Sequence, residues 1–130
     1  MLNHIMIGSN NINKSKNFYN AVLGVLGAGE AVEHVNSTGQ GRLFYIHDGS
    51  TFSVSEPING QPANAANGST IGFVCNSPEQ VKEFHDVAIA NGGTSIEAPP
   101  GPRAGHPAGS VHLCYFRDPD GHKICGIYRP

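Results

Sequence analysis

The sequence predicts an α+β fold built from two copies of one strand–helix–strand–strand–strand (βαβββ) module. Two observations support this prediction. When residue 4 is aligned with residue 70, an offset of 66, the two halves align without a gap through both expected helices. Few residues are identical, but the helix caps and the buried positions coincide. The chain of 130 residues also ends in an expected hairpin, residues 115–128, whose Asp118-Pro119-Asp120-Gly121 segment has the composition of a tight turn.

The first half of the chain contains one expected helix and four expected strands. Apolar residues at helical spacing predict a helix over residues 14–26, and Gly27 and Gly29 end it. The last two strands form a hairpin around Asp48-Gly49. The expected strands are residues 2–8, 31–36, 42–47 and 51–56.

The second half repeats this order after a linker, residues 58–69, that is rich in Pro, Asn, Gly and Ala. Ser77 and Gln80 have the spacing of a capping box at the start of the second helix, and Gly92-Gly93 ends it. The expected strands are residues 70–75, 94–97, 110–116 and 123–128, with a long loop over residues 98–109. We therefore divide a single domain, residues 1–130, into module one (1–57), the linker (58–69) and module two (70–130).

Composition excludes several classes of partner. The formal net charge is −2 and no block of lysine or arginine occurs, so neither nucleic acid nor a membrane surface is an expected partner. No apolar segment approaches the roughly 20 residues of a membrane helix, and no secretory signal is recognised. The three cysteines are an odd number without paired spacing, which favours a reducing cytoplasm over a disulfide framework.

The two modules, the Asp118–Gly121 turn and a Ser15-x-x-Phe18-Tyr19 helix resemble the vicinal oxygen chelate superfamily. That superfamily includes glyoxalase I, extradiol dioxygenases, bleomycin-resistance proteins and fosfomycin-resistance proteins. The resemblance covers nearly the whole chain and is closest to the glyoxalase-like branch. It implies paired modules that form an open barrel-like cup, a site on the concave face of the cup and a homodimer.

The resemblance also implies where metal ligands would lie, on the first and last strands of each module. The first two positions hold His4 and Glu56 in this sequence. The third, at offset 66 from His4, holds Thr70 in place of the usual histidine, and the fourth holds Cys125 in place of the usual carboxylate. A divalent ion (Zn, Ni, Fe or Mn) is one expectation, with His4 and Glu56 as ligands, and no metal is the other.

Each of these residues also has a structural alternative. His4 is either a ligand or a hydrogen-bonded strand residue, and Glu56 is either a cup carboxylate, as ligand or general base, or a charge emerging at a strand end. Cys125 is either a zinc or substrate contact or a small buried apolar residue. The residues do not choose between these alternatives.

Three further side chains are candidates for chemistry in module two. Arg103 and His106 lie in the 98–109 loop, which either closes over the cup to bind a small anionic substrate or is a plain solvent connection. His112 shares a strand face with Cys114 and Phe116. If that face lines the cup, His112 is a candidate ligand or general base, and otherwise it is a sheet-surface residue. His34, His47 and His122 are expected in solvent.

Two functions are consistent with these residues. The first is a glyoxalase-like enzyme, of lyase, isomerase or dioxygenase type, that acts on a small oxygenated substrate with Glu56 or His112 as catalytic residues and Arg103, His106, Thr70 and Cys125 as substrate contacts. The second is a metal-free protein that sequesters a small ligand, as bleomycin-resistance proteins of the superfamily do.

Overall fold

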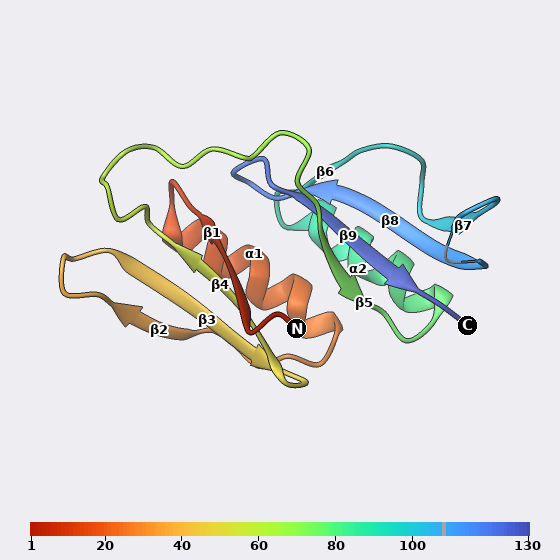
Figure 1. The fold of residues 1–130 in the computed structure, drawn as a ribbon, viewed down its shortest axis with the longest axis horizontal. Coiled ribbons are helices and arrows are strands. Elements are labelled where there is room, and N and C mark those ends of the chain that lie inside the picture. Colours follow the sequence, from red (N-terminus) through yellow and green to blue (C-terminus); the bar gives the residue numbers. More distant parts are fainter. Residues whose placement is uncertain (108) are drawn as a thin grey trace.

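The structure, a computed structural model, describes residues 1–107 and 109–130, and it contains two modules joined by an arching linker (Figure 1). The first module consists of β1 (His4–Gly8), α1 (Ile12–Val25), β2 (Val32–Val35), β3 (Gly41–His47) and β4 (Ser50–Ser55). The second consists of β5 (Ile71–Val74), α2 (Pro78–Ala90), β6 (Thr94–Ser95), β7 (Gly101–Arg103), β8 (Val111–Arg117) and β9 (Lys123–Tyr128).

The two sheets have equivalent topologies. Their strand orders are β1-β4-β3-β2 and β5-β9-β8-β6, and in each the first strand is parallel to the last while the other pairs are antiparallel. The sheets do not close on each other, so the molecule has the predicted α+β fold of two modules around an open cup. The short strand β7 pairs with β8 inside the segment that the sequence predicted to be a loop.

Side chains at the helix starts fix where each helix begins. Asn11 accepts a hydrogen bond from the backbone N–H of Lys14 at 3.0 Å, so α1 begins two residues before the predicted start. Ser77 caps α2 by accepting from Gln80 N at 3.0 Å, and the Gln80 side chain accepts in return from Asn76 N at 2.7 Å. Neither helix, within the described residues, has the length and apolar character needed to cross a membrane.

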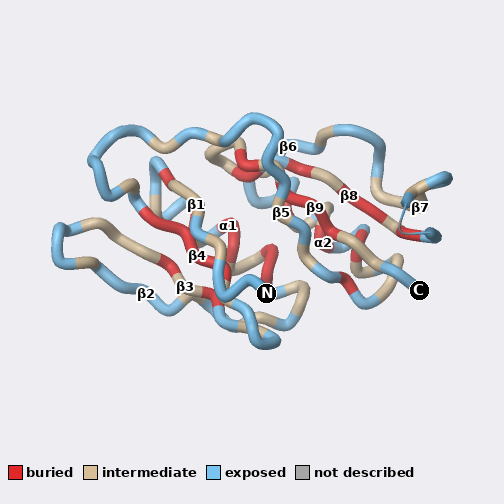
Figure 2. Tube along the Cα trace, viewed as in Figure 1, coloured by how far each residue is buried: buried red, intermediate tan, exposed pale blue. Residues whose placement is uncertain are grey.

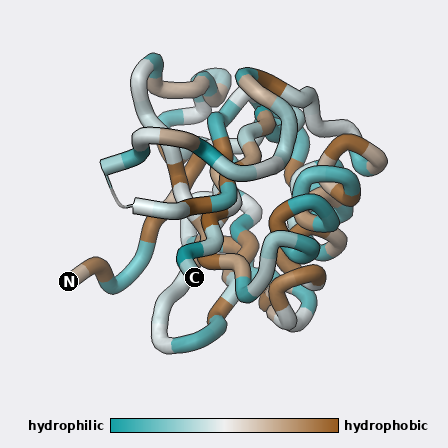
Figure 3. Tube along the Cα trace, turned by 90° about the vertical axis from the view of Figure 1, so that its right-hand side faces the viewer, coloured by the Kyte–Doolittle hydropathy of each residue, from teal (hydrophilic) through white to brown (hydrophobic). Residues whose placement is uncertain are grey.

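The helices lie on one side of both sheets and share one core with them (Figure 3). Figure 2 shows the buried residues concentrated along the central strands and the inner helix faces. The Phe116 ring lies 6.1 Å from that of Phe18 on α1 and 5.3 Å from that of Phe84 on α2. The rings of Phe52 and Phe73 meet edge to face at 5.2 Å across the modules. The modules are therefore packed as one body.

Polar contacts from residues 118–122, which we call the clasp, also join the modules. Tyr19 Oη donates to Asp118 Oδ2 at 2.6 Å, the N–H of Asn10 donates to Asp120 Oδ1 at 2.9 Å, and the His122 ring lies 2.7 Å from the carbonyl oxygen of Gly8. Burial raises the pKa of Asp118, although the Tyr19 hydrogen bond opposes the rise. The clasp thus attaches the β8–β9 turn to the start of α1.

Candidate functional site

The strands present one face to the helices and the other to the cup. In β4 and β3 the side chains of Phe52, Val54, Leu43 and Tyr45 are buried on the helix face. Since side chains alternate along a strand, the intervening residues and their register partners, including His4 on β1, face the cup. We call this surface the cup face.

His4 and Glu56 lie at opposite ends of the β1–β4 pair. His4 pairs with Thr51 at one end and Gly8 pairs with Ser55 at the other, one residue before Glu56. Four residue steps of about 3.3 Å separate these ends by about 13 Å. One metal ion cannot reach ligands at both ends, so the structure does not bring together the two metal ligands predicted from the sequence.

Glu56 instead contacts the start of β3. Its Oε1 accepts a hydrogen bond from the backbone N–H of Gly41 at 2.7 Å, and its side chain is exposed. His4 is also exposed and hydrogen-bonds its neighbour Asn3 at 2.7 Å. Among the residues that the structure describes, no group of three or more His, Cys, Asp or Glu side chains is arranged to hold a metal ion. The donor set therefore does not fit the predicted ion.

Thr70 and Cys125 lie on the cup face of module two. Ile71 pairs with Ile124, so Thr70 comes beside Lys123, and Gly72 pairs with Cys125. The Cys125 side chain is buried, and burial raises the pKa of its thiol. Cys125 packs in a small apolar cluster with Val111 and Leu113. The placement matches the apolar alternative for Cys125.

The guanidinium of Arg103 is held by its own segment. It donates to the carbonyl oxygens of Gly101 at 3.1 Å and Ala98 at 3.0 Å, and β7 pairs Arg103 with Val111. These bonds fold residues 98–103 onto the edge of β8 and occupy donors that an anionic substrate would need. His106 is half-buried in the same segment.

His112 lies on the helix face of β8. Cys114 and Phe116, which share its face, pack in the core beneath α2, and the His112 ring lies 6.1 Å from that of Tyr128. Val111 and Leu113 occupy the cup face in its place, in a small apolar cluster with Cys125. His112 therefore does not lie on the cup face, because the alternation of side chains along β8 places it on the helix face.

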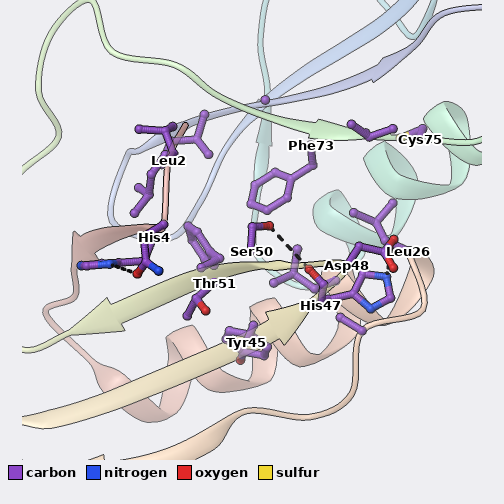
Figure 4. A pocket seen from close by; sticks show the side chains of 18 of the residues that line it. Leu2, His4, Leu26, Tyr45, His47, Asp48, Ser50, Thr51, Phe73 and Cys75 are labelled. Carbon is purple, nitrogen blue, oxygen red and sulfur yellow. Dashed lines mark hydrogen bonds and ion pairs between the residues drawn. The ribbon is translucent and has the colours of Figure 1, made fainter.

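A cavity of about 530 Å³, which we call the junction cleft, opens between β1 and β5. In Figure 4 the Phe73 side chain projects from β5 into this space, above the strands that carry Tyr45 and Thr51. Both modules and the end of α1 contribute to its lining. Its apolar residues include Leu2, Ile5, Leu23, Leu26, Phe52 and Phe73.

Polar side chains lie at the edge of the junction cleft. His47 Nε2 is 3.4 Å from Asp48 Oδ2 at the β3–β4 turn, and His4 lies at the start of β1. Of the residues predicted from the sequence, only His4 lines this cleft. The sequence marked the Asp48-Gly49 turn but contained no signal that this turn would face β5, since that depends on how the modules pack.

The sequence was also compared with known protein families. The model of the "Glyoxalase/Bleomycin resistance protein/Dioxygenase superfamily" matches residues 1–125. The chain belongs to this superfamily. The match covers both modules and the clasp, in agreement with the resemblance inferred from the sequence. None of the curated proteins matches the sequence significantly.

Solved structures of the same superfamily share the fold. A glyoxalase/bleomycin resistance protein from Albidiferax ferrireducens T118 is 50% identical, with 99% of each chain covered and a TM-score of 0.90. A glyoxalase-related enzyme from Fulvimarina pelagi is 18% identical over 100% of this chain and 88% of that one, with a TM-score of 0.72. A fosfomycin resistance protein from Listeria monocytogenes is 22% identical over 100% and 93% of the chains, with a TM-score of 0.66. The last two likenesses concern the fold alone.

Proposed function

We propose that this superfamily member binds a small organic molecule in the junction cleft and that it does so without a metal held by His4 and Glu56. The observation that carries the proposal is the cleft itself. It has a volume typical of small-molecule sites and a lining that is more apolar than polar, with polar side chains from both modules. A ligand with an apolar body and polar groups at its ends would match this lining.

The separation of the predicted ligands supports binding without a metal. His4 and Glu56 lie at opposite ends of β1 and β4, and Cys125 is a buried thiol. A sequestering function of the bleomycin-resistance kind needs only a cleft of suitable shape. We also expect a homodimer in the cytoplasm, and light scattering of the purified protein checks the oligomeric state.

A glyoxalase-like enzyme is the second candidate, and the His47–Asp48 pair favours it. An imidazole beside a carboxylate at the edge of a cleft is a suitable general base for removing a proton from a bound substrate. A lyase, isomerase or dioxygenase that depends on Zn, Ni, Fe or Mn would require ligands other than the His4–Glu56 pair.

The proposal is tested with a larger side chain at a residue that lines the cleft and with a fluorescent probe whose binding is measured. Gly72 lines the cleft and no atom lies within 4 Å of its Cβ position, so Gly72→Leu adds apolar bulk to the lining and its Cβ meets no clash. We expect the fluorescent probe 8-anilinonaphthalene-1-sulfonate to bind the native protein with one-to-one stoichiometry. Its affinity should fall about tenfold in Gly72→Leu, because apolar contact area is lost.

The matched control is Gly24→Leu, on α1 outside the cleft and also without a neighbour near its Cβ position. Equal affinity of the probe for Gly72→Leu and the native protein would contradict the assignment of the cleft. Metal analysis after soaking with Zn²⁺, Ni²⁺, Fe²⁺ and Mn²⁺ tests the second part of the proposal, that His4 and Glu56 hold no metal. Stoichiometric metal that is lost in both His4→Ala and Glu56→Ala would contradict binding without a metal.

A further inference from the structure

Two cations lie directly opposite each other where β8 and β9 meet the clasp. Arg117 pairs with Lys123 in the antiparallel register, and both fall on the cup face because they alternate with Phe116 and Ile124. Like charges directly opposite on neighbouring strands are destabilising. An anion bound between them would offset this repulsion.

The linker closes a second cavity over this pair. Its volume is about 300 Å³, and Arg117 and Lys123 line it together with residues 65–69 of the linker and Thr70. The linker turns there through a hydrogen bond from Ser69 N to Ala66 O at 3.1 Å. The turn places Asn67, Ser69 and Thr70, whose amide and hydroxyl groups donate hydrogen bonds, in the lining. The cavity thus combines two cations with neutral donors.

The carboxylates near this cavity lie outside its lining, and one of them is paired with Lys123. Asp118 and Asp120 are directed to Tyr19 and to Asn10 in module one. Glu97 is ion-paired with Lys123 but does not line the cavity, and the ammonium of Lys123 lies 4.7 Å from the centre of the Tyr115 ring. No carboxylate is found among the described residues that line the cavity.

Arg117 has donors to offer a ligand. Among the described residues its guanidinium makes one hydrogen bond, from Nη1 to the carbonyl oxygen of Gly121 at 2.8 Å. A guanidinium carries five N–H donors in a planar fork, and this geometry suits two oxygens of one oxyanion. Lys123 adds a point charge on the adjacent strand.

We propose that Arg117 and Lys123, together with residues 65–69 of the linker and Thr70, form a binding site for a phosphate group. The described lining of this site shares no residue with the junction cleft, so the proposal is independent of the proposed function. The phosphate can be inorganic or part of a small phosphate monoester. Thr70, which the sequence analysis placed among the substrate contacts, contributes its hydroxyl here.

The experiment is calorimetric titration of the native protein at low ionic strength with inorganic phosphate and, separately, with glycerol 3-phosphate. We expect saturable one-to-one binding that weakens about tenfold or more in Arg117→Gln and in Lys123→Gln, because each loses a charge-assisted hydrogen bond. Tighter binding of one probe identifies which form of phosphate the site accepts.

Lys82→Gln is the matched control, because Lys82 is an exposed cation on α2 that is ion-paired with Asp86. Circular dichroism confirms that each variant is folded. The proposal is overturned if phosphate binding does not saturate, or if Lys82→Gln weakens it as much as Arg117→Gln does. Such results would mean that phosphate contacts exposed cations of the protein weakly and without a specific site.

Discussion

At the scale of single residues, the pair of Tyr19 and Asp118 is the most deeply buried polar contact between the modules. Tyr19 is fully buried, and Asp118 is 5% exposed. Burial and the adjacent carboxylate raise the pKa of Tyr19 well above its usual value. The phenol therefore stays protonated and donates a hydrogen bond to Asp118. This contact therefore depends on both protonation states.

Tyr19→Phe should destabilise the protein by about 1–3 kcal/mol, because a buried carboxylate oxygen loses its donor. Urea denaturation at neutral pH measures this change. The hydrogen bond favours the charged carboxylate, so its contribution is present above the pKa of Asp118 and is lost as the pH falls through it. Because burial raises that pKa above its ordinary value, the difference in stability between the native protein and Tyr19→Phe should begin to shrink correspondingly early on acidification, although protonation of Asp118 itself favours the folded state.

Tyr128→Phe is the control, since the Tyr128 hydroxyl makes no hydrogen bond to the described residues and the ring is half-buried. Its effect should stay within about 0.5 kcal/mol. Equal destabilisation by the two substitutions would mean that the phenol–carboxylate contact contributes nothing specific.

Residue-level interpretation of the sequence succeeded only where local chemistry decided the outcome. Ser77 caps its helix as predicted, because a cap depends on neighbours within three residues. His122 was expected in solvent, yet it is 9% exposed and contacts Gly8 of the other module. That contact depends on the packing of distant segments, which the sequence around His122 does not encode.

At the scale of elements, β9 owes its close packing to the absence of a side chain at Gly126. A Cβ at this position would lie 2.8 Å from Cys114 Sγ and 2.8 Å from Phe84 Cδ2. Glycine therefore lets α2 and the neighbouring strand approach β9.

Gly126→Ala should cost about 1–3 kcal/mol, because the added methyl overpacks the core between β8 and α2. Thermal or urea unfolding monitored by circular dichroism measures it. Gly72→Ala in the adjacent strand β5 is the control, since no atom lies within 4 Å of its Cβ position. A Gly126→Ala protein as stable as Gly72→Ala would show that the core relaxes around the methyl group.

The repeat predicted the order of elements well but not every strand. The offset that aligns Phe18 with Phe84 places both rings in the common core, because both helices bury the same stripe. β7 was missed, since its sequence, Gly101-Pro102-Arg103, reads as a turn. Its pairing with β8 depends on an edge strand that the local pattern does not show.

At the scale of the whole molecule, the two modules share one core and should unfold together. Phe116 contacts rings of both helices, and Phe52 meets Phe73 across the modules. We expect a single transition in urea, with coincident curves from far-ultraviolet circular dichroism and tyrosine fluorescence. Two separated transitions would contradict this expectation and would mean that each module is stable alone.

The position of the site is also a property of the whole molecule. The repeat assigned equivalent positions in the two modules, such as His4 and Thr70, but it said nothing of the distance between His4 and Glu56 along β1 and β4. The junction cleft depends on how β5 lies against β1, and no residue pattern within one module specifies that arrangement.

The clasp has a consequence for how relatives of this protein diverge. The Asp118–Gly121 turn, by which the sequence resembles its superfamily, contacts the start of α1 and lines neither cavity. Substitutions that remodel either cavity can therefore leave this turn and its contacts unchanged. A search pattern written from it retrieves proteins of one architecture, and their reactions must be established from other residues.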